Sequence, residues 1–155
     1  MELPDGVIHF LERQGFVIVS TLDAKGAIHC SAKGIVGIEK QGRVFVIDLY
    51  KHKTFENLKR NPIVSISAVD EHKFVGYTIQ GKAKIVPRED MQEHIVSKWE
   101  ERILERISKR VASAVQAGVK SKGHFEVKLP EKPKYLIEID VENIIDLAPP
   151  QFDNH

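Results

Sequence analysis

The chain of 155 residues carries 23 Lys and Arg against 22 Asp and Glu, so its bulk charge attracts neither nucleic acid nor anionic lipid. With 42% hydrophobic and 29% charged residues, it has the composition of an ordinary globular protein, which argues against a disordered or membrane-spanning chain. The length predicts a single domain over residues 1–155. Because the N-terminus lacks the basic and apolar parts of a secretion signal, we expect a cytoplasmic protein.

The first 38 residues predict a short helix and then a hairpin. Pro4 and the apolar spacing that follows it are typical of a helix start, and Gly15 ends the helix. Two strands follow over 16–22 and 28–38, joined by a turn that ends in Gly26. Glycines 34 and 37 predict a bend or bulge in the second strand.

The second strand alternates apolar and polar side chains: Ile28, Cys30 and Ala32 against His29, Ser31 and Lys33. We therefore expect Cys30 on the apolar face, where a thiol is most often a small core residue. As the single cysteine of the sequence, it forms neither an internal disulfide nor a Cys-only metal site.

Four further strands are indicated over 44–49, 63–69, 75–85 and 135–141. A strand longer than about ten residues tends to curl, so the strand over 75–85 favours a barrel rather than a flat sheet. A short helix over 54–60 ends before Asn61-Pro62, since the residue before a proline avoids the helical region. The predicted fold is α+β, mainly β, with a small antiparallel barrel.

The segment 89–117 contains neither proline nor glycine and predicts one helix or a pair. Its apolar residues recur at steps of four: Met91, Ile95, Trp99, Ile103, Ile107, Val111 and Val115. A single helix of that length would reach ~45 Å, which exceeds the diameter of such a domain. We therefore expect the helix to be broken or to project along a partner subunit.

Other motifs are weak. The segment 76–83 resembles a phosphate-binding loop, but Ala83 stands where a Ser or Thr must hold magnesium, and the alternation of a strand runs through it. The seven histidines are scattered, which predicts no metal site, and the sequence contains no Gly-x-Ser-x-Gly elbow. The basic stretch 106–122 lacks an aromatic stacking platform, so we expect no nucleic-acid partner. No apolar run approaches the length of a membrane span, so we expect no membrane partner.

Residues 48–62 have the composition of an anion site. A strand end here leads to a helix start, where exposed backbone N–H groups favour phosphate. Lys53 would neutralise the anion, while Thr54 and Asn57 would donate hydrogen bonds. The alternative, in which Lys51 and Lys53 are surface charges and Thr54 only caps the helix, is equally open on chemistry alone.

Over residues 15–86, and more weakly over 135–146, the chain resembles the FMN-binding split-barrel family, the relatives of pyridoxamine 5′-phosphate oxidase. The runs that carry the resemblance are STLDAKG at 20–26, IHCSA at 28–32, KTFENLKRNPIVS at 53–65 and QGKAKIV at 80–86. The resemblance implies a six-stranded antiparallel split β-barrel with flanking helices, here with a long helical insertion. It also implies a homodimer with one FMN in each of two clefts between subunits.

The resemblance further implies a division of the cofactor site into two parts. Lys53, Thr54 and Asn57 would hold the FMN phosphate. The ring would be lined by Cys30, Ser31, Ala32, Lys33, Asp48, Leu49 and Tyr50. Near the ring, His29, Lys33 and Tyr50 are the residues to test for a catalytic role.

These features predict an FMN-dependent oxidoreductase that acts on a small planar substrate. The oxidase that names the family holds its substrate with an arginine and a histidine near its C-terminus, whereas the matching end of this chain, 135–142, is acidic. Pyridoxamine phosphate oxidation itself is therefore not expected. Two alternatives remain: a non-catalytic flavin carrier or sensor, and the same barrel with deazaflavin or haem.

Overall fold

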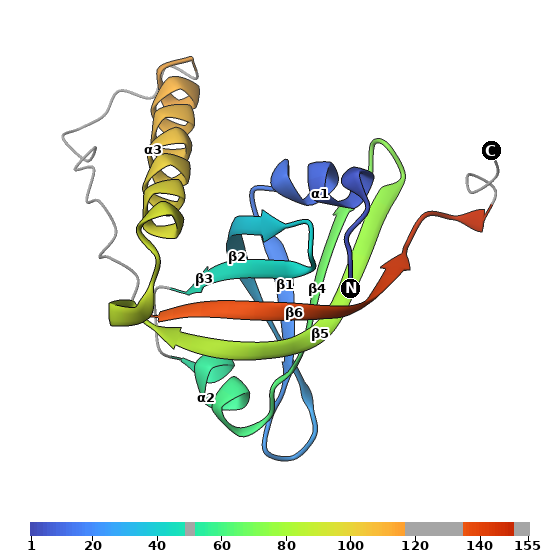
Figure 1. Ribbon diagram of the computed structural model, residues 1–155. Coiled ribbons are helices and arrows are strands. Elements are labelled where there is room, and N and C mark those ends of the chain that lie inside the picture. Colours follow the sequence, from blue (N-terminus) through green and yellow to red (C-terminus); the bar gives the residue numbers. More distant parts are fainter. Residues whose placement is uncertain (49–51, 117–134, 151–155) are drawn as a thin grey trace.

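The computed structural model describes residues 1–48, 52–116 and 135–150 (Figure 1). In these ranges the strands are β1 (Val17–Leu22), β2 (Ile28–Glu39), β3 (Arg43–Asp48), β4 (Ile63–Asp70), β5 (Val75–Pro87) and β6 (Tyr135–Asp146). The helices are α1 (Asp5–Glu12), α2 (Lys53–Arg60) and α3 (Glu93–Gln116), with a 3₁₀ turn at Arg88–Asp90. None of the described helices is both long and apolar enough to cross a bilayer.

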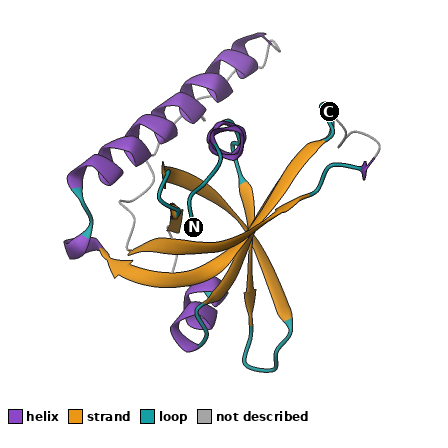
Figure 2. Cartoon of the chain, turned by 45° about the vertical axis from the view of Figure 1, so that its right-hand side comes forward, coloured by secondary structure: helices purple, strands orange, loops and turns teal. Residues whose placement is uncertain are grey.

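The six strands form a closed antiparallel barrel in the order β1-β2-β3-β6-β5-β4. Figure 2 shows the helices placed around the outside of the strands. The last strand, β6, closes the barrel because it pairs with β3 on one side and with β5 on the other. The long strand β5 spans both the pairing with β4 and the pairing with β6. The barrel and the mainly β fold class expected from the sequence are confirmed.

Branched aliphatic side chains from all six strands fill the barrel interior: Val17, Val19, Ile35, Val44, Val46, Ile66, Ile79, Ile137 and Ile139. Two helices cover the ends of this interior (Figure 1). Val7 and Leu11 of α1 belong to the same core at one end, and Leu58 of α2 belongs to it at the other. The two short amphipathic helices that the sequence predicts thus cover the two ends of the barrel.

The β1–β2 turn and the bulge of β2 occur where the sequence predicts them. Gly26 has a φ of 79° in the β1–β2 turn, and Asp23 Oδ1 accepts hydrogen bonds of 2.9 Å from the backbone N–H groups of Lys25 and Ala27. The register of β2 against β3 shifts between Ile35 and Gly37, which is the expected bulge. The segment resembling a phosphate-binding loop lies entirely within β5, so the strand interpretation is correct.

In the described part of the segment 89–117 there is one α-helix, which is one of the two arrangements expected, and it begins later than predicted. After the 3₁₀ turn, α3 begins at Glu93, and its 24 residues span about 36 Å. Ile95 and Trp99 pack against Phe45 and Ile47 on the outer surface of β3. These contacts place the first turns of α3 on the outside of the barrel, and Figure 1 shows the helix extending past it. Packing of α3 along a partner subunit stays a prediction.

Cys30 lies on the outward face of β2, although the sequence pattern predicts it on the inward, core-facing side. Ile28 is 74% exposed and Cys30 is exposed, whereas His29 and Ser31 on the other face are half-buried. Burial of polar groups is permitted here because they find partners, such as the Thr54 hydroxyl for Ser31. The prediction that Cys30 is a core residue was therefore wrong.

The β5–β6 register shift at Gly81 generates a stability prediction. A Cβ at this position would lie 2.0 Å from the main-chain oxygen of Asp140, so Gly81→Ala forces the two strands apart. We expect the free energy of unfolding in urea to fall by about 2–3 kcal/mol. The control is Gly6→Ala in α1, where a Cβ meets nothing within 4 Å and helix propensity favours alanine by up to ~1 kcal/mol. Equal stability of the two variants would contradict this account of the bulge.

Candidate cofactor site

The helix α2 lies across the end of the barrel and positions the residues predicted to bind phosphate. It ends at Arg60, with Asn61 as an extended C-cap before Pro62. One side of the helix is buried, and this side includes Thr54 and Asn57, each 2% exposed. The opposite side carries charged residues, so the helix is amphipathic although it has only eight residues.

Side-chain hydrogen bonds join α2 to the first two strands. The hydroxyl groups of Ser31 and Thr54 are 2.9 Å apart, and Asn57 Nδ2 donates to Thr21 Oγ1 over 3.0 Å. Asn57 Oδ1 accepts from the Arg60 guanidinium at 3.1 Å. The buried polar groups of α2 are thus satisfied by the barrel, which fixes the position of the helix start.

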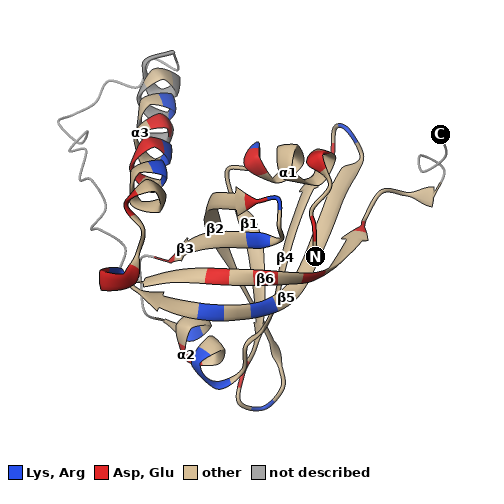
Figure 3. Cartoon of the chain, in the orientation of Figure 1, with Lys and Arg blue, Asp and Glu red and all other residues tan. Residues whose placement is uncertain are grey.

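The N-terminal end of α2 is basic and open to solvent. Lys53 is its first residue and is exposed. His52, the N-cap residue, makes no side-chain capping bond, so its side chain does not satisfy the first backbone N–H groups of the helix. Figure 3 shows Lys and Arg side by side on α2 and on the adjacent part of β5. This arrangement suits a phosphate group.

A buried polar network lies at the same end of the barrel, where β3 stops and β6 begins. Asp48 is 2% exposed; its Oδ1 lies 2.9 Å from Lys33 Nζ, and its Oδ2 accepts a hydrogen bond from the Tyr135 hydroxyl. Phe55 of α2 packs edge-on against the Tyr135 ring with centroids 4.8 Å apart. Burial, together with the neighbouring Asp48 carboxylate, raises the pKa of Tyr135 above its ordinary value. The network links β2, β3, β6 and α2.

The structure brings some of the predicted residues together and separates others. Ser31 and Lys33 share the inward face of β2 with the network and with α2, while Cys30 and Ala32 point outward. Two of the predicted ring-lining residues, Leu49 and Tyr50, lie outside the described residues.

Sequence reasoning missed Tyr135 as a site residue and missed the partners of Thr54 and Asn57. The sequence did mark Tyr135 as the first residue of the predicted closing strand. The structure shows that this strand pairs with β3, with Tyr135 opposite Asp48. The Ser31–Thr54 contact joins residues 23 positions apart, and no local pattern reports such a contact.

The donor set fits a phosphate-bearing cofactor more closely than a metal. The ranges described hold no group of three or more His, Cys, Asp or Glu side chains arranged around a common point. By contrast, α2 begins with the exposed Lys53, and the next residue, Thr54, pairs its hydroxyl group with that of Ser31. Such donors match phosphate oxygens in both charge and hydrogen-bonding capacity.

The Tyr135–Asp48 bond generates a pH-dependent prediction. Tyr135→Phe removes a donor to a buried carboxylate and is expected to lower the free energy of unfolding by about 1.5–3 kcal/mol near neutral pH. Because the pKa of Tyr135 is raised on folding, its contribution is complete below about pH 10 and declines as the pH rises further. Urea unfolding from pH 7 to 11 should show the two stability curves converging at the alkaline end.

The matched control is Tyr77→Phe, since the Tyr77 hydroxyl makes no hydrogen bond within the described ranges and its ring packs edge-on against Phe10. Its stability difference from the wild type near neutral pH should be much smaller than that of Tyr135→Phe. Curves for Tyr135→Phe and wild type that stay parallel to pH 11 would contradict the assignment.

Comparison with known proteins agrees with this architecture. Residues 3–146 match the family model described as pyridoxamine 5′-phosphate oxidase. HupZ of Group A Streptococcus is 19% identical, with 94% of each chain covered and a TM-score of 0.62. A putative pyridoxamine 5′-phosphate oxidase from Lactobacillus delbrueckii is 16% identical, with 93% of each chain covered and a TM-score of 0.60.

An F420 reductase is 15% identical over 92% of this chain and 98% of its own, with a TM-score of 0.59. At these identities the solved structures share the fold, the six-stranded split barrel. No curated protein matches the chain significantly. The family match covers most of the sequence, and so this chain belongs to the pyridoxamine 5′-phosphate oxidase family.

Proposed function

We propose that this protein is a homodimeric FMN-dependent oxidoreductase that acts on a small planar substrate. The observation that carries the proposal is the exposed Lys53 at the start of α2, a helix held to the barrel by the Ser31–Thr54 and Asn57–Thr21 hydrogen bonds. A fixed cationic helix start is suited to binding the terminal phosphate of a cofactor. The family includes flavin-dependent and F420-dependent oxidoreductases.

Two parts of the proposed site would hold FMN. Lys53 and the first N–H groups of α2 would bind the phosphate, and the hydroxyl pair of Ser31 and Thr54 would add hydrogen bonds. The edge of β2 near Cys30 and Ala32 would lie along the ring. FMN supplies the hydride or electron transfer when bound, and the protein binds and orients it.

The homodimer is supported by an exposed apolar surface around the outward face of β1, β2 and β4. Ile18, Ile28 and Ile63 are 43%, 74% and 52% exposed, and cross-strand pairs place Cys30 beside Ser20 on the same face. Apolar surface of this kind is favourably buried against another protein surface. A second copy of the chain would cover it and would complete a cleft along β2, as the family resemblance implies.

A deazaflavin cofactor is the second candidate, and the shared fold with an F420 reductase favours it specifically. Both cofactors carry a phosphate on a flexible side chain, so the α2 site serves either. A non-catalytic carrier or sensor remains the alternative reading of the same site; it would bind FMN tightly and show no turnover with reduced nicotinamide.

Lys53→Ala tests the phosphate site. Loss of one charge-assisted hydrogen bond should weaken FMN binding about 10–100-fold, since such a bond contributes about 1.5–3 kcal/mol. The measurement is a titration of flavin fluorescence with the cofactor-free protein. Lys73→Ala, in the exposed β4–β5 turn, is the control and should leave affinity within about twofold. Unchanged affinity in Lys53→Ala would count decisively against this site.

Ile28→Glu tests the dimer. A carboxylate on the exposed apolar face should convert a dimer into monomers, because burying an unpaired charge in an interface is costly. Light scattering coupled to size exclusion gives the mass of wild type and variant. Leu147→Glu, at an exposed apolar position after the end of β6, serves as the control and should remain dimeric. A wild type that is monomeric at all concentrations would refute the homodimer.

A further inference from the structure

A small pocket lies between α3 and the outer surface of the barrel. Its volume is about 160 Å³, and its apolar lining comes from both sides: Phe16, Val36 and Ile47 from the barrel side, Trp99 and Ile103 from the helix. An apolar protein cavity of roughly 150 Å³ accommodates a benzene ring. The pocket therefore has the size and the lining for one small aromatic ring.

The pocket adjoins the proposed flavin site. Ala32, Lys33 and Asp48, three of the residues predicted to line the ring, also form part of the pocket wall. Ala32 points outward from β2, and Gly34 two residues later pairs with Ile47 of β3 on the same surface. A molecule held under α3 would thus lie beside a flavin placed along β2.

One charged side chain of α3, Arg102, borders this pocket with part of its hydrogen-bonding capacity unused. Its Nη2 donates to the main-chain oxygen of Glu12 at 2.9 Å, which orients the guanidinium. Its Nη1 is buried and has no hydrogen-bond partner within the described ranges. A buried donor without an acceptor is costly, so this atom favours an incoming acceptor.

The electrostatic surroundings leave the guanidinium a cation. Burial lowers the pKa of Arg102, and the nearby charges of Glu12 and Glu105 oppose that shift. Neither carboxylate lies within ion-pair distance of it in the part of the chain that the structure describes. An arginine presents parallel donors that match a carboxylate better than they match a single oxygen.

From these observations we infer that the pocket under α3 binds a small aromatic carboxylate, with its ring against Trp99 and its carboxylate on Arg102. This inference deepens the proposed function. It rests on that function only where it identifies the bound carboxylate as the substrate. The pocket itself needs no flavin to be formed. Trp99 and Ile103 of α3 supply apolar wall to the pocket, and Arg102 of the same helix supplies a cation.

The sequence provides its own probe, because Trp99 is the single tryptophan and lines the pocket. Benzoate titrated into the cofactor-free protein should change Trp99 fluorescence saturably. Benzamide, which has the same shape without the charge, should bind at least about tenfold more weakly. Equal affinities for benzoate and benzamide, or no saturable change in Trp99 fluorescence with benzoate, would overturn the inference. The wild-type protein is sufficient for this test.

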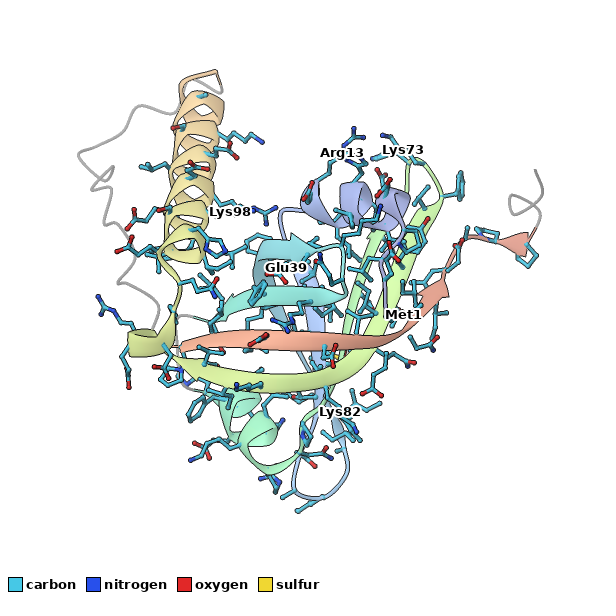
Figure 4. The ribbon with its side chains drawn as sticks, in the orientation of Figure 1. Met1, Arg13, Glu39, Lys73, Lys82 and Lys98 are labelled. Atoms are coloured by element: carbon cyan, nitrogen blue, oxygen red, sulfur yellow. The ribbon has the colours of Figure 1, made fainter. Side chains whose placement is uncertain are left out.

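Two variants assign the charge to Arg102. Arg102→Met keeps an unbranched side chain as far as the Nε position but removes the guanidinium, so it should weaken benzoate at least about tenfold and weaken the uncharged benzamide much less. The affinity of Arg102→Lys for benzoate should lie between those of Arg102→Met and the wild type, since the positive charge remains but the bidentate geometry is lost. The control is Lys98→Met, one turn earlier on α3; Figure 4 shows Lys98 on the side of α3 toward α1, and it borders a neighbouring hollow instead. Equal loss in Lys98→Met and Arg102→Met would overturn the assignment.

A second readout separates this inference from the proposed function. In FMN-loaded protein, benzoate should shift the flavin absorbance, and Arg102→Met should abolish the shift without changing FMN affinity. Benzoate binding with the Arg102 dependence in a protein that never binds FMN would retain the pocket and reject the flavin. FMN binding with no response of either Trp99 or the flavin to benzoate would reject the pocket and retain the flavin.

Discussion

Two side-chain hydrogen bonds, Ser31 with Thr54 and Asn57 to Thr21, hold α2 against the end of the barrel. All four groups are polar and sit where the interior would otherwise be apolar, so each bond removes the cost of burying its partner. Phe55 adds an aromatic contact to the closing strand. The start of the helix is fixed by these contacts, and every functional feature proposed for Lys53 depends on that fixed position.

The strand β2 serves three surfaces at once, which explains its mixed sequence. Its inward polar residues bind α2 and Asp48, its outward apolar residues form an exposed surface, and its bulge near Gly37 lets α3 approach. A Cβ at Gly37 would lie 3.2 Å from the end of the Ile95 side chain, so the glycine also gives α3 room. The proposed flavin site, the proposed dimer face and the pocket under α3 all include residues of this single strand.

Much of the fold follows from local sequence signals, because strands, turns and helix ends are set by neighbouring residues. The bulge glycines, the Asp23 turn and the helix end before Pro62 are examples. The orientation of Cys30 could not be read in this way, since it depends on partners that β2 meets only after the barrel closes. The same holds for Arg102, whose unused donor is defined by packing between α3 and the barrel. Local chemistry and the family resemblance suggested Lys53, Thr54 and Asn57 as candidates for a phosphate site. Neither showed that Thr54 and Asn57 are buried against β1 and β2.

The most direct test of the central claim is the visible absorbance spectrum of the purified protein, with mass identification of the molecule that heating releases. The account predicts the two absorbance bands of an oxidised flavin and the release of FMN, held by the α2 end of the barrel. A single deazaflavin band would keep the site and change the cofactor. A colourless protein that also fails to bind added FMN or deazaflavin would contradict the assignment of this barrel as a flavin-type redox protein.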